Sequence, residues 1–130
     1  MDRNKKRLLI VDDNEQVRVL LPELFNSYAL GGLYTTACSG NDAIELIQQG
    51  ISFDLIICDL NMPDGDGKVV FDFTQTSPYS IPFILYTSAT DVAPFKGTNF
   101  LGSVEKSDFR SLMTLISQIF FGNGLRPTNY

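Results

Sequence analysis

Histidine is absent from the sequence, whose 130 residues contain 15 acidic and ten basic side chains. Its absence excludes imidazole general-base catalysis, a histidine-ligated zinc site and the role of a phosphohistidine carrier. Any chemistry must therefore use carboxylates, hydroxyls and lysine. Cysteine is scarce as well, and both copies, Cys38 and Cys58, fall in segments that we interpret as core strands. We expect two buried thiols acting as small apolar side chains, not a disulfide or a metal-binding pair.

Long apolar runs are missing too. No stretch approaches the roughly 18 apolar residues that a membrane-spanning helix needs, and Met1 is followed by Asp-Arg-Asn-Lys-Lys instead of a signal peptide. Positive charge is sparse, since the net charge is -5 and the longest basic run is Lys5-Lys6-Arg7. We therefore expect a cytoplasmic protein that binds neither membranes nor nucleic acids directly.

The length of the chain and its hydrophobic content of 44% suit one globular domain with a substantial core. No internal repeat, linker or low-complexity segment divides the sequence. We expect a single domain over residues 1–130, with its core at about residues 6–121, a flexible basic N-terminus and a loose C-terminal tail.

Five short apolar runs predict β-strands, and segments in which apolar side chains recur at helical spacing separate most of them. The runs cover residues 8–11, 33–38, 53–58, 81–86 and 100–104. Their continuous apolar character is typical of parallel strands that are buried on both faces. Strands that alternate with helices predict an α/β fold, with a doubly wound five-stranded parallel sheet, right-handed crossovers and helices on both faces.

Polar residues and glycines predict where the helices begin and end. Asn14 is a candidate N-cap for the first helix, and Ser39 opens a capping box for the second. Ser107 is the candidate N-cap of the last helix, which Gly122 should end. Helix signals are weak between residues 90 and 99, so we expect only a short or irregular fourth helix there.

Asp59 ends one of the apolar runs and begins a sharply turning loop. Residues 55–58 are Leu-Ile-Ile-Cys, whereas Pro63, Gly65 and Gly67 follow soon after the aspartate. Proline fixes its own φ and glycine permits positive φ, so the chain should turn close to the carboxylate. Ligands bind at the carboxyl ends of strands in open α/β sheets, which makes Asp59 a candidate functional residue. A solvated aspartate in an ordinary turn explains this segment alone equally well.

A second acidic site follows the first predicted strand, where Asp12 and Asp13 stand. A doubly wound sheet would bring this pair and Asp59 into one crevice. Three neighbouring carboxylates repel one another, so either their pKa values rise or a cation lies among them. Hard oxygen ligands favour Mg²⁺ over zinc, and the backbone carbonyl of Asn61 could complete the shell. Taken alone, Asp12 and Asp13 could instead be a charge pair at a helix N-terminus.

Thr87 stands at the end of the fourth predicted strand, and Lys106 follows the fifth. A hydroxyl and an ammonium that converge on a carboxylate would stabilise negative charge arriving there, as phosphoryl transfer requires. Alone, the two residues are better explained as an ordinary strand-end hydroxyl and an exposed cation. Their occurrence at strand ends together with three acids favours the functional interpretation.

This ordered set resembles the receiver domain of two-component response regulators, and the resemblance covers nearly the whole chain. The matching features are the acidic pair, Asp59 with Met62-Pro63-x-x-Asp66-Gly67 behind it, Thr87 and Lys106. The resemblance is to chemotaxis-regulator-like domains, and it implies a flavodoxin-like sheet with the strand order 2-1-3-4-5.

The resemblance also implies a role for each site residue. Asp59 would be the phosphoacceptor, Mg²⁺ would be the cofactor, and Thr87 and Lys106 would contact the phosphoryl group. The direct Mg²⁺ ligands would be Asp13, Asp59 and the backbone carbonyl of Asn61, with Asp12 helping through water. The domain would be a signalling switch and not an enzyme, although it would promote its own phosphorylation and dephosphorylation.

The implied partners are a histidine kinase or a histidine phosphotransfer protein, and an unknown downstream protein that reads a shift between two conformations. A homodimer is a further alternative, because Phe120 and Phe121 could belong to the core, to a dimer face or to a contact with a missing domain. The sequence departs from the family pattern at Ser107, where proline usually follows the lysine, and at Ser103, where an aromatic residue is common.

Two other classes of function stay open. One is a receiver-fold binding module that acts largely without phosphorylation. The other is an enzyme on a flavodoxin-like fold, which the charge pattern disfavours. An aspartate-nucleophile phosphatase would need an acid at Asn61, and a flavin carrier would need a Ser/Thr-rich loop where Asp12 and Asp13 stand.

Overall fold

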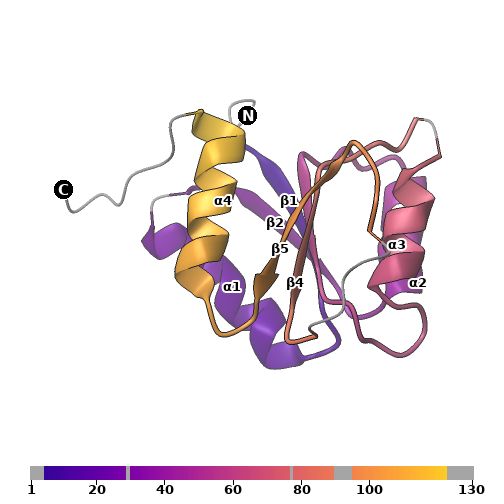
Figure 1. Cartoon of the computed structure of the whole chain (residues 1–130), viewed down its shortest axis with the longest axis horizontal. Helices are drawn as coiled ribbons and strands as arrows, with labels where there is room; N and C mark the ends of the chain where they lie inside the picture. Colours follow the sequence, from indigo (N-terminus) through magenta and orange to yellow (C-terminus); the bar gives the residue numbers. More distant parts are fainter. Residues whose placement is uncertain (1–4, 29, 77, 90–94, 123–130) are drawn as a thin grey trace.

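The computed structural model describes residues 5–28, 30–76, 78–89 and 95–122 of the chain. A central sheet lies between two layers of helices (Figure 1). The elements are β1 (Arg7–Val11), α1 (Glu15–Ser27), β2 (Leu33–Ala37), α2 (Gly40–Gln48), β3 (Leu55–Cys58), α3 (Gly67–Thr74), β4 (Phe83–Thr87), β5 (Phe100–Glu105) and α4 (Phe109–Phe121).

The sheet has five strands in the order β2-β1-β3-β4-β5, and every neighbouring pair is parallel. The register places Val11 beside Ala37 on one side and beside Cys58 on the other. The carboxyl ends of these three strands therefore lie level at one edge of the sheet. This topology confirms the predicted doubly wound, flavodoxin-like α/β fold.

One irregularity interrupts the pairing of β4 with β5. Phe83 pairs with Phe100, but the next residue, Ile84, pairs with Gly102. Leu101 is therefore an extra residue in β5, and Gly102 has a φ of 147° that suits glycine. From this β-bulge onward the ladder continues in regular register to the end of both strands.

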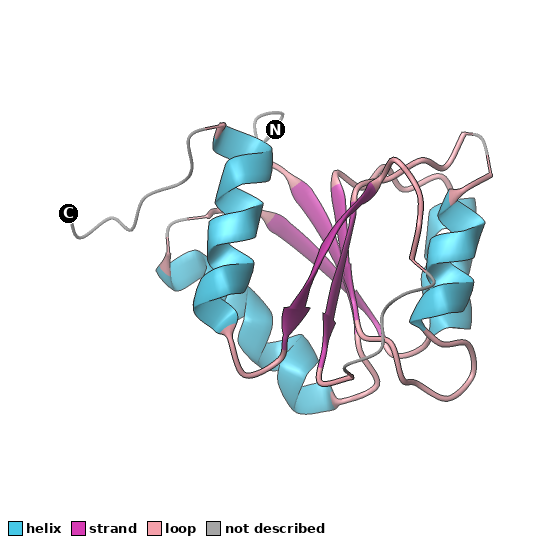
Figure 2. Ribbon diagram, in the orientation of Figure 1, coloured by secondary structure: helices cyan, strands magenta, loops and turns pink. Residues whose placement is uncertain are grey.

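In the part of the chain that the structure describes, two helices cover each face of the sheet (Figure 2). α2 and α3 pack on one face in a cluster that includes Phe71 and Ile56, and α1 and α4 pack on the other around Phe25 and Ile57. Successive residues of β3 contribute to opposite clusters, so both faces of this strand are buried. Burial on both faces explains why the central strands are continuous apolar runs in the sequence.

The predicted N-caps are right for α1 and α2 and wrong for α4. Asn14 and Ser39 each accept a backbone N–H of the following helix through the side chain. For α4 the cap is Asp108 and not Ser107, and its Oδ1 accepts from Ser111 N at 3.1 Å. The Ser111 hydroxyl donates to the other carboxylate oxygen at 2.6 Å. The helix begins one residue later than predicted because the carboxylate at 108 accepts both of these donors.

The prediction for the cysteines is half right. Cys58 is buried in β3, whereas Cys38 lies just beyond the end of β2 and is exposed. The Cys38 thiol donates to Asp42 Oδ2 at 2.8 Å, and this hydrogen bond raises the pKa of the thiol. Because β2 is an edge strand that ends at Ala37, no strand within the described residues covers the thiol on that side.

The predicted short or irregular helix between residues 90 and 99 lies only partly within the described residues. Residues 90–94 lie outside the described residues, and residues 95–99 form no helix. Phe95 enters the core beside α3 and is only 6% exposed, with its ring centroid 5.3 Å from that of Phe71 and 5.4 Å from that of Phe100. A buried aromatic side chain therefore packs beside α3 in the described part of this connection.

Asn99 fixes the start of β5 to two other segments. Its Nδ2 donates to Thr74 Oγ at 2.9 Å and to the Ile81 carbonyl at 2.7 Å, and its Oδ1 accepts from Gln75 Nε2 at 2.8 Å. A buried amide requires partners of this kind, and here it joins the C-terminal end of α3 to the segment before β4.

The last helix ends where the sequence predicts. α4 ends at Phe121, and Gly122 follows with a φ of 68°. The predicted flexible N-terminus and C-terminal tail fall largely on residues 1–4 and 123–130, outside the described residues. Within the described residues, no helix has the length and apolar character needed to cross a membrane.

Candidate functional site

Two aspartates meet where β1 and β3 end. Asp12 directly follows β1, and Asp59 directly follows β3. The Asp59 N–H donates to the Val11 carbonyl at 2.9 Å, and the Asp12 N–H donates to the Ala37 carbonyl at 3.1 Å. Asp12 is 2% exposed and Asp59 is 7% exposed. The register of the sheet therefore holds both carboxylates at one edge with little access to water.

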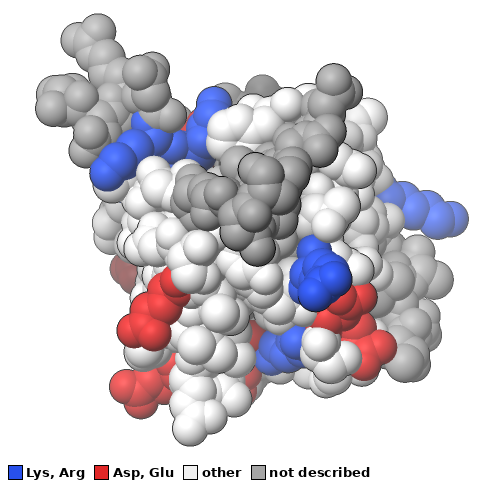
Figure 3. All heavy atoms as spheres, turned by 90° about the vertical axis from the view of Figure 1, so that its left-hand side faces the viewer, with Lys and Arg blue, Asp and Glu red and all other residues white. Residues whose placement is uncertain are grey.

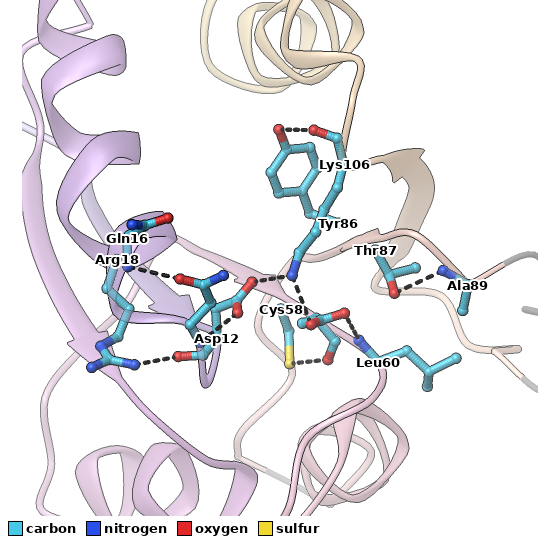
Figure 4. A network of polar contacts seen from close by, with 11 residues as sticks. Asp12, Gln16, Arg18, Cys58, Leu60, Tyr86, Thr87, Ala89 and Lys106 are labelled. Atoms are coloured by element: carbon cyan, nitrogen blue, oxygen red, sulfur yellow. Dashed lines mark hydrogen bonds and ion pairs between the residues drawn. The ribbon is translucent and has the colours of Figure 1, made fainter.

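Lys106 pairs with both carboxylates. Its Nζ lies 2.8 Å from Asp59 Oδ2 and 2.7 Å from Asp12 Oδ2 (Figure 4). The lysine follows β5, so its side chain reaches past β4 to the ends of β3 and β1. One positive charge thus faces two negative charges in a partly buried site, where charges interact more strongly than in water.

Burial and charge pairing shift the pKa values of these groups. Desolvation raises the pKa of Asp12, although the hydrogen bond from Lys106 acts against this shift. Burial alone would lower the pKa of Lys106, but the hydrogen bonds to Asp12 and Asp59 outweigh it and raise that pKa. The ammonium therefore stays charged at neutral pH, where it can offset negative charge that arrives at Asp59.

Asp13 completes a group of three acids at this edge. Asp12, Asp13 and Asp59 each offer a carboxylate oxygen, and these oxygens lie within 4.8 Å of one another. Oxygens this close could hold one divalent cation, by direct ligation or through a bound water. The donor set also fits Mg²⁺, because this ion prefers carboxylates and water as ligands. Asp13 is exposed, so water can reach the site beside it.

The remaining predicted site residues lie nearby. Thr87 ends β4, is 3% exposed and accepts a hydrogen bond from Ala89 N at 3.2 Å through its Oγ. A hydroxyl that accepts one hydrogen bond can also donate one. Asn61 is exposed in the loop that follows Asp59. The structure thus places Thr87 at the same edge of the sheet as the acids and Asn61 in the adjoining loop.

The loop between β3 and α3 is held against the first turn of α2. Asp64 has a φ of 58° and Gly65 a φ of 97°. Their carbonyls accept from Asn41 N at 3.1 Å and from Gly40 N at 2.7 Å. Sequence reasoning missed Gly40, where a Cβ would lie 2.5 Å from the Gly65 carbonyl oxygen. These contacts fix the course of the chain shortly after Asp59.

Sequence reasoning also missed two contacts to the backbone of the site. Arg18 of α1 donates from its guanidinium to the Asp12 carbonyl at 2.8 Å. Tyr86 of β4 donates from its hydroxyl to the Lys106 carbonyl at 2.8 Å. Every residue has a backbone carbonyl, so a hydrogen bond to one cannot be predicted from the residue type of the acceptor. For Tyr86, the only signal in the sequence was a polar hydroxyl at the end of an apolar run.

A family model described as the response regulator receiver domain matches residues 8–105. The chain belongs to this family. Regulator of RpoS from Escherichia coli (strain K12) is 37% identical to this receiver domain over 86 residues, which are 66% of this chain and 24% of that protein. Response regulator SaeR from Staphylococcus aureus (strain NCTC 8325 / PS 47) is 34% identical over 83 residues, which are 64% of this chain and 35% of that protein. The match therefore spans a minor part of each relative's length.

Solved structures have the same fold as this receiver domain. The response regulator TrrA from Thermotoga maritima, in complex with Mg(2+)-BeF, is 27% identical with a TM-score of 0.75, covering 88% of this chain and 98% of that chain. A CheY-like receiver domain from Methanospirillum hungatei has a TM-score of 0.78 at 19% identity, covering 89% and 94% of the two chains. These findings confirm the resemblance to two-component receiver domains, which are signalling domains.

Proposed function

We propose that this receiver domain is a phosphoacceptor switch in which Asp59 receives a phosphoryl group in a Mg²⁺-dependent reaction. The observation that carries the proposal is the 2.8 Å ion pair between Asp59 and Lys106 beside two further acids. A purely structural ion pair needs one partner for each charge, and additional carboxylates only add repulsion. An excess of acid around one lysine is instead suited to a site that gains a divalent cation and a phosphoryl group.

The reaction would join a carboxylate oxygen of Asp59 to phosphorus. The bond from phosphorus to the nitrogen or oxygen of the donor would break, its electron pair would leave with the donor, and the product would be an acyl phosphate. Asp59 Oδ1 accepts from Leu60 N at 2.7 Å, and Oδ2 accepts from Lys106 Nζ at 2.8 Å. These two bonds orient the carboxylate, and each oxygen retains a lone pair for the attack.

Lys106 and Thr87 would stabilise the new phosphoryl group. The ammonium would neutralise one phosphoryl oxygen, and the Thr87 hydroxyl would donate to another. When bound, Mg²⁺ would act as a Lewis acid on the phosphoryl oxygens. Its direct ligands would be Asp13, Asp59 and the backbone carbonyl of Asn61, with Asp12 helping through water.

The proposed phosphoryl donor is a histidine kinase or a histidine phosphotransfer protein, which would supply the imidazole that this chain lacks. α1 begins close to the acidic pair and exposes Val19 and Leu20, while α4 exposes Phe121. The side of the molecule that carries α1 and α4 has a broad uncharged area between its acidic and basic side chains (Figure 3). This side is the proposed contact surface for the donor, for a downstream protein or for a second copy of the domain.

We also propose that the receiver domain acts in the cytoplasm. We further propose that it is one folding unit with its core at about residues 6–121. The family match ends at residue 105, but α4 follows it and buries Leu112 and Ile116 in the cluster that contains β1 and β3 residues. The last helix therefore belongs to the same core as the matched segment.

Incubation with acetyl phosphate and Mg²⁺ tests the proposal. The wild-type protein should gain one phosphoryl group, measured by intact-protein mass spectrometry, and Asp59→Asn should gain none. Asp54→Asn is the matched control, because Asp54 is exposed at the opposite end of β3 and its carboxylate accepts from Arg7 N. The control should be labelled like the wild type. Labelling of Asp59→Asn at the wild-type rate would disprove the assignment of the site.

A binding module that works without phosphorylation is the second candidate function. The observation that favours it is the firm attachment of residues 95–99, through the buried Phe95 ring and the hydrogen bonds of Asn99. These contacts oppose a movement of residues 95–99 on phosphorylation. If one phosphoryl group is added at Asp59 but the amide NMR spectrum changes only next to that residue, this second function gains support.

A further inference from the structure

Two neighbouring residues of β4 hold the backbone of Lys106. The Lys106 N–H donates to the Thr87 carbonyl at 3.1 Å, and the Lys106 carbonyl accepts from the Tyr86 hydroxyl at 2.8 Å. The first bond lies next to the β-ladder that ends at Thr87 and Glu105. The second bond comes from a side chain and acts beyond the last residue of β5 (Figure 4). The lysine peptide is therefore fixed on both sides although it lies outside the strand.

The position of the ammonium depends on this backbone. A lysine side chain is a flexible four-carbon stem, so the position of its charge depends on the backbone at its root as well as on its ion pairs. Ser107 follows Lys106 and does not restrict the backbone as a proline would. The next fixed point is a turn in which Asp108 N donates to the Glu105 carbonyl at 2.9 Å. Within the described residues, the tyrosine hydroxyl is thus the side-chain anchor of the Lys106 carbonyl.

Tyr86 is well placed to act as an anchor. It is 6% exposed, and its ring belongs to the cluster between the sheet, α1 and α4. Burial raises the pKa of its hydroxyl, so the group keeps its proton and remains a donor. A buried hydroxyl without a partner would be costly, and the partner here is the carbonyl of the site lysine.

We propose that Tyr86 is a positioning residue that acts through Lys106, holding its ammonium between Asp59 and Asp12. The proposal rests on the phosphoacceptor function for its effect on rate, because the ammonium would then meet the incoming phosphoryl group. Its effect on the geometry of Lys106 does not depend on that function.

Tyr86→Phe tests the proposal, because it removes the hydroxyl and leaves the ring. Tyr34→Phe is the matched control: the Tyr34 hydroxyl is also hydrogen-bonded, accepting from Gly32 N at 3.1 Å and donating to Asn26 Oδ1 at 3.3 Å, but it lies at the amino end of β2. The readout is the pair of ε-methylene proton NMR signals of Lys106, assigned by their loss in Lys106→Arg. A fixed side chain places these two protons in different surroundings, so their shifts should differ in the wild type and in Tyr34→Phe. In Tyr86→Phe, in which the ion pairs to Asp12 and Asp59 remain, the difference between the two shifts should decrease.

The rate of labelling by acetyl phosphate and Mg²⁺ gives the second readout. Tyr86→Phe should slow the labelling of Asp59 by roughly threefold to tenfold, the range expected for one net hydrogen bond, and Tyr34→Phe should not. An unchanged difference between the ε-methylene shifts in Tyr86→Phe, or an equal loss of rate in both variants, would overturn the proposal. If the wild-type protein is not labelled at Asp59, the phosphoacceptor function fails, and the NMR comparison alone decides the role of Tyr86.

Discussion

Gly67 packs directly against the main chain of Asp59. A Cβ at residue 67 would lie 2.4 Å from the Asp59 carbonyl oxygen and 3.0 Å from Leu60 Cα. The Gly67 N–H also donates to the Leu60 carbonyl at 2.8 Å. The first residue of α3 therefore has room only for a hydrogen, and the start of this helix is fixed relative to the proposed phosphoacceptor.

Gly67→Ala should lower the free energy of unfolding by about 1–3 kcal/mol, because the added methyl group forces the backbone of Asp59 to move. It should also slow labelling of Asp59 by acetyl phosphate. Gly50→Ala is the control, since Gly50 has a φ of 91° but nothing within 4 Å of its added Cβ. That variant should lose about 1–2 kcal/mol through backbone strain and keep the wild-type labelling rate. Urea denaturation measures the stabilities, and unchanged labelling of Gly67→Ala would contradict the expected movement.

Mg²⁺ binding should depend on Asp13. At ten times its dissociation constant, Mg²⁺ should raise the free energy of unfolding of the wild-type protein by about 1.4 kcal/mol. Asp13→Asn should bind Mg²⁺ more weakly, so the same Mg²⁺ concentration should raise its free energy of unfolding by less. Asp54→Asn should behave like the wild type. Without Mg²⁺, Asp13→Asn should be at least as stable as the wild type, because one of three mutually repelling carboxylates is neutralised. Isothermal titration calorimetry measures the affinity, and a wild-type dissociation constant in Asp13→Asn would exclude this residue as a ligand.

The cap of α4 should respond to acid. The Ser111 hydroxyl and N–H lower the pKa of Asp108 below its ordinary 3.8, so the folded protein favours the charged carboxylate. The resulting stabilisation is present above the unfolded pKa of 3.8 and is lost as pH falls through the lower folded value. Asp108→Ala should therefore be less stable than the wild type at pH 7, with a difference that shrinks below pH 3.8. Urea denaturation from pH 2.5 to 7 tests this, and Ser107→Ala should show a smaller loss at pH 7.

Phe95 should contribute strongly to stability. Its ring contacts those of Phe71, Phe83 and Phe100, so Phe95→Ala should leave a cavity and cost about 3–5 kcal/mol. Phe121→Ala is the control, because Phe121 is 49% exposed and its loss should change stability by less than about 0.5 kcal/mol. Equal losses in the two variants would show that Phe95 does not fill the core in solution.

The strands and the residues at their ends could be predicted because apolar runs and turn residues are local signals. The observed strand boundaries differ from the predicted ones by one or two residues, because burial alone does not define a strand. Phe53 illustrates this: it is 6% exposed, as its apolar character suggested, but β3 begins at Leu55. The ends of β1 and β3 were located correctly because the first polar residues there, Asp12 and Asp59, directly follow the apolar runs.

The missed features depend on tertiary neighbours. The exposure of Cys38 follows from the place of β2 at the edge of the sheet, which a run of apolar residues cannot reveal. The Tyr86 anchor joins a hydroxyl to a carbonyl 20 residues later in the chain. The packing of Phe95 depends on aromatic rings from three different elements. In each case the decisive partner is distant in sequence.

The extra residue in β5 has a consequence for the lysine. Side chains alternate between the two faces of a strand, so inserting Leu101 exchanges the faces of all residues that follow it in β5. It also sets every following residue of β5 back by about 3.3 Å relative to β4. In a β5 without the bulge, Leu101 would pair with Ile84 and Val104 with Thr87, so Lys106 would lie one residue farther along and on the opposite face, aimed away from the carboxylates. The extra residue near the amino end of β5 therefore determines the face on which the Lys106 side chain lies, and so whether its ammonium can reach Asp59.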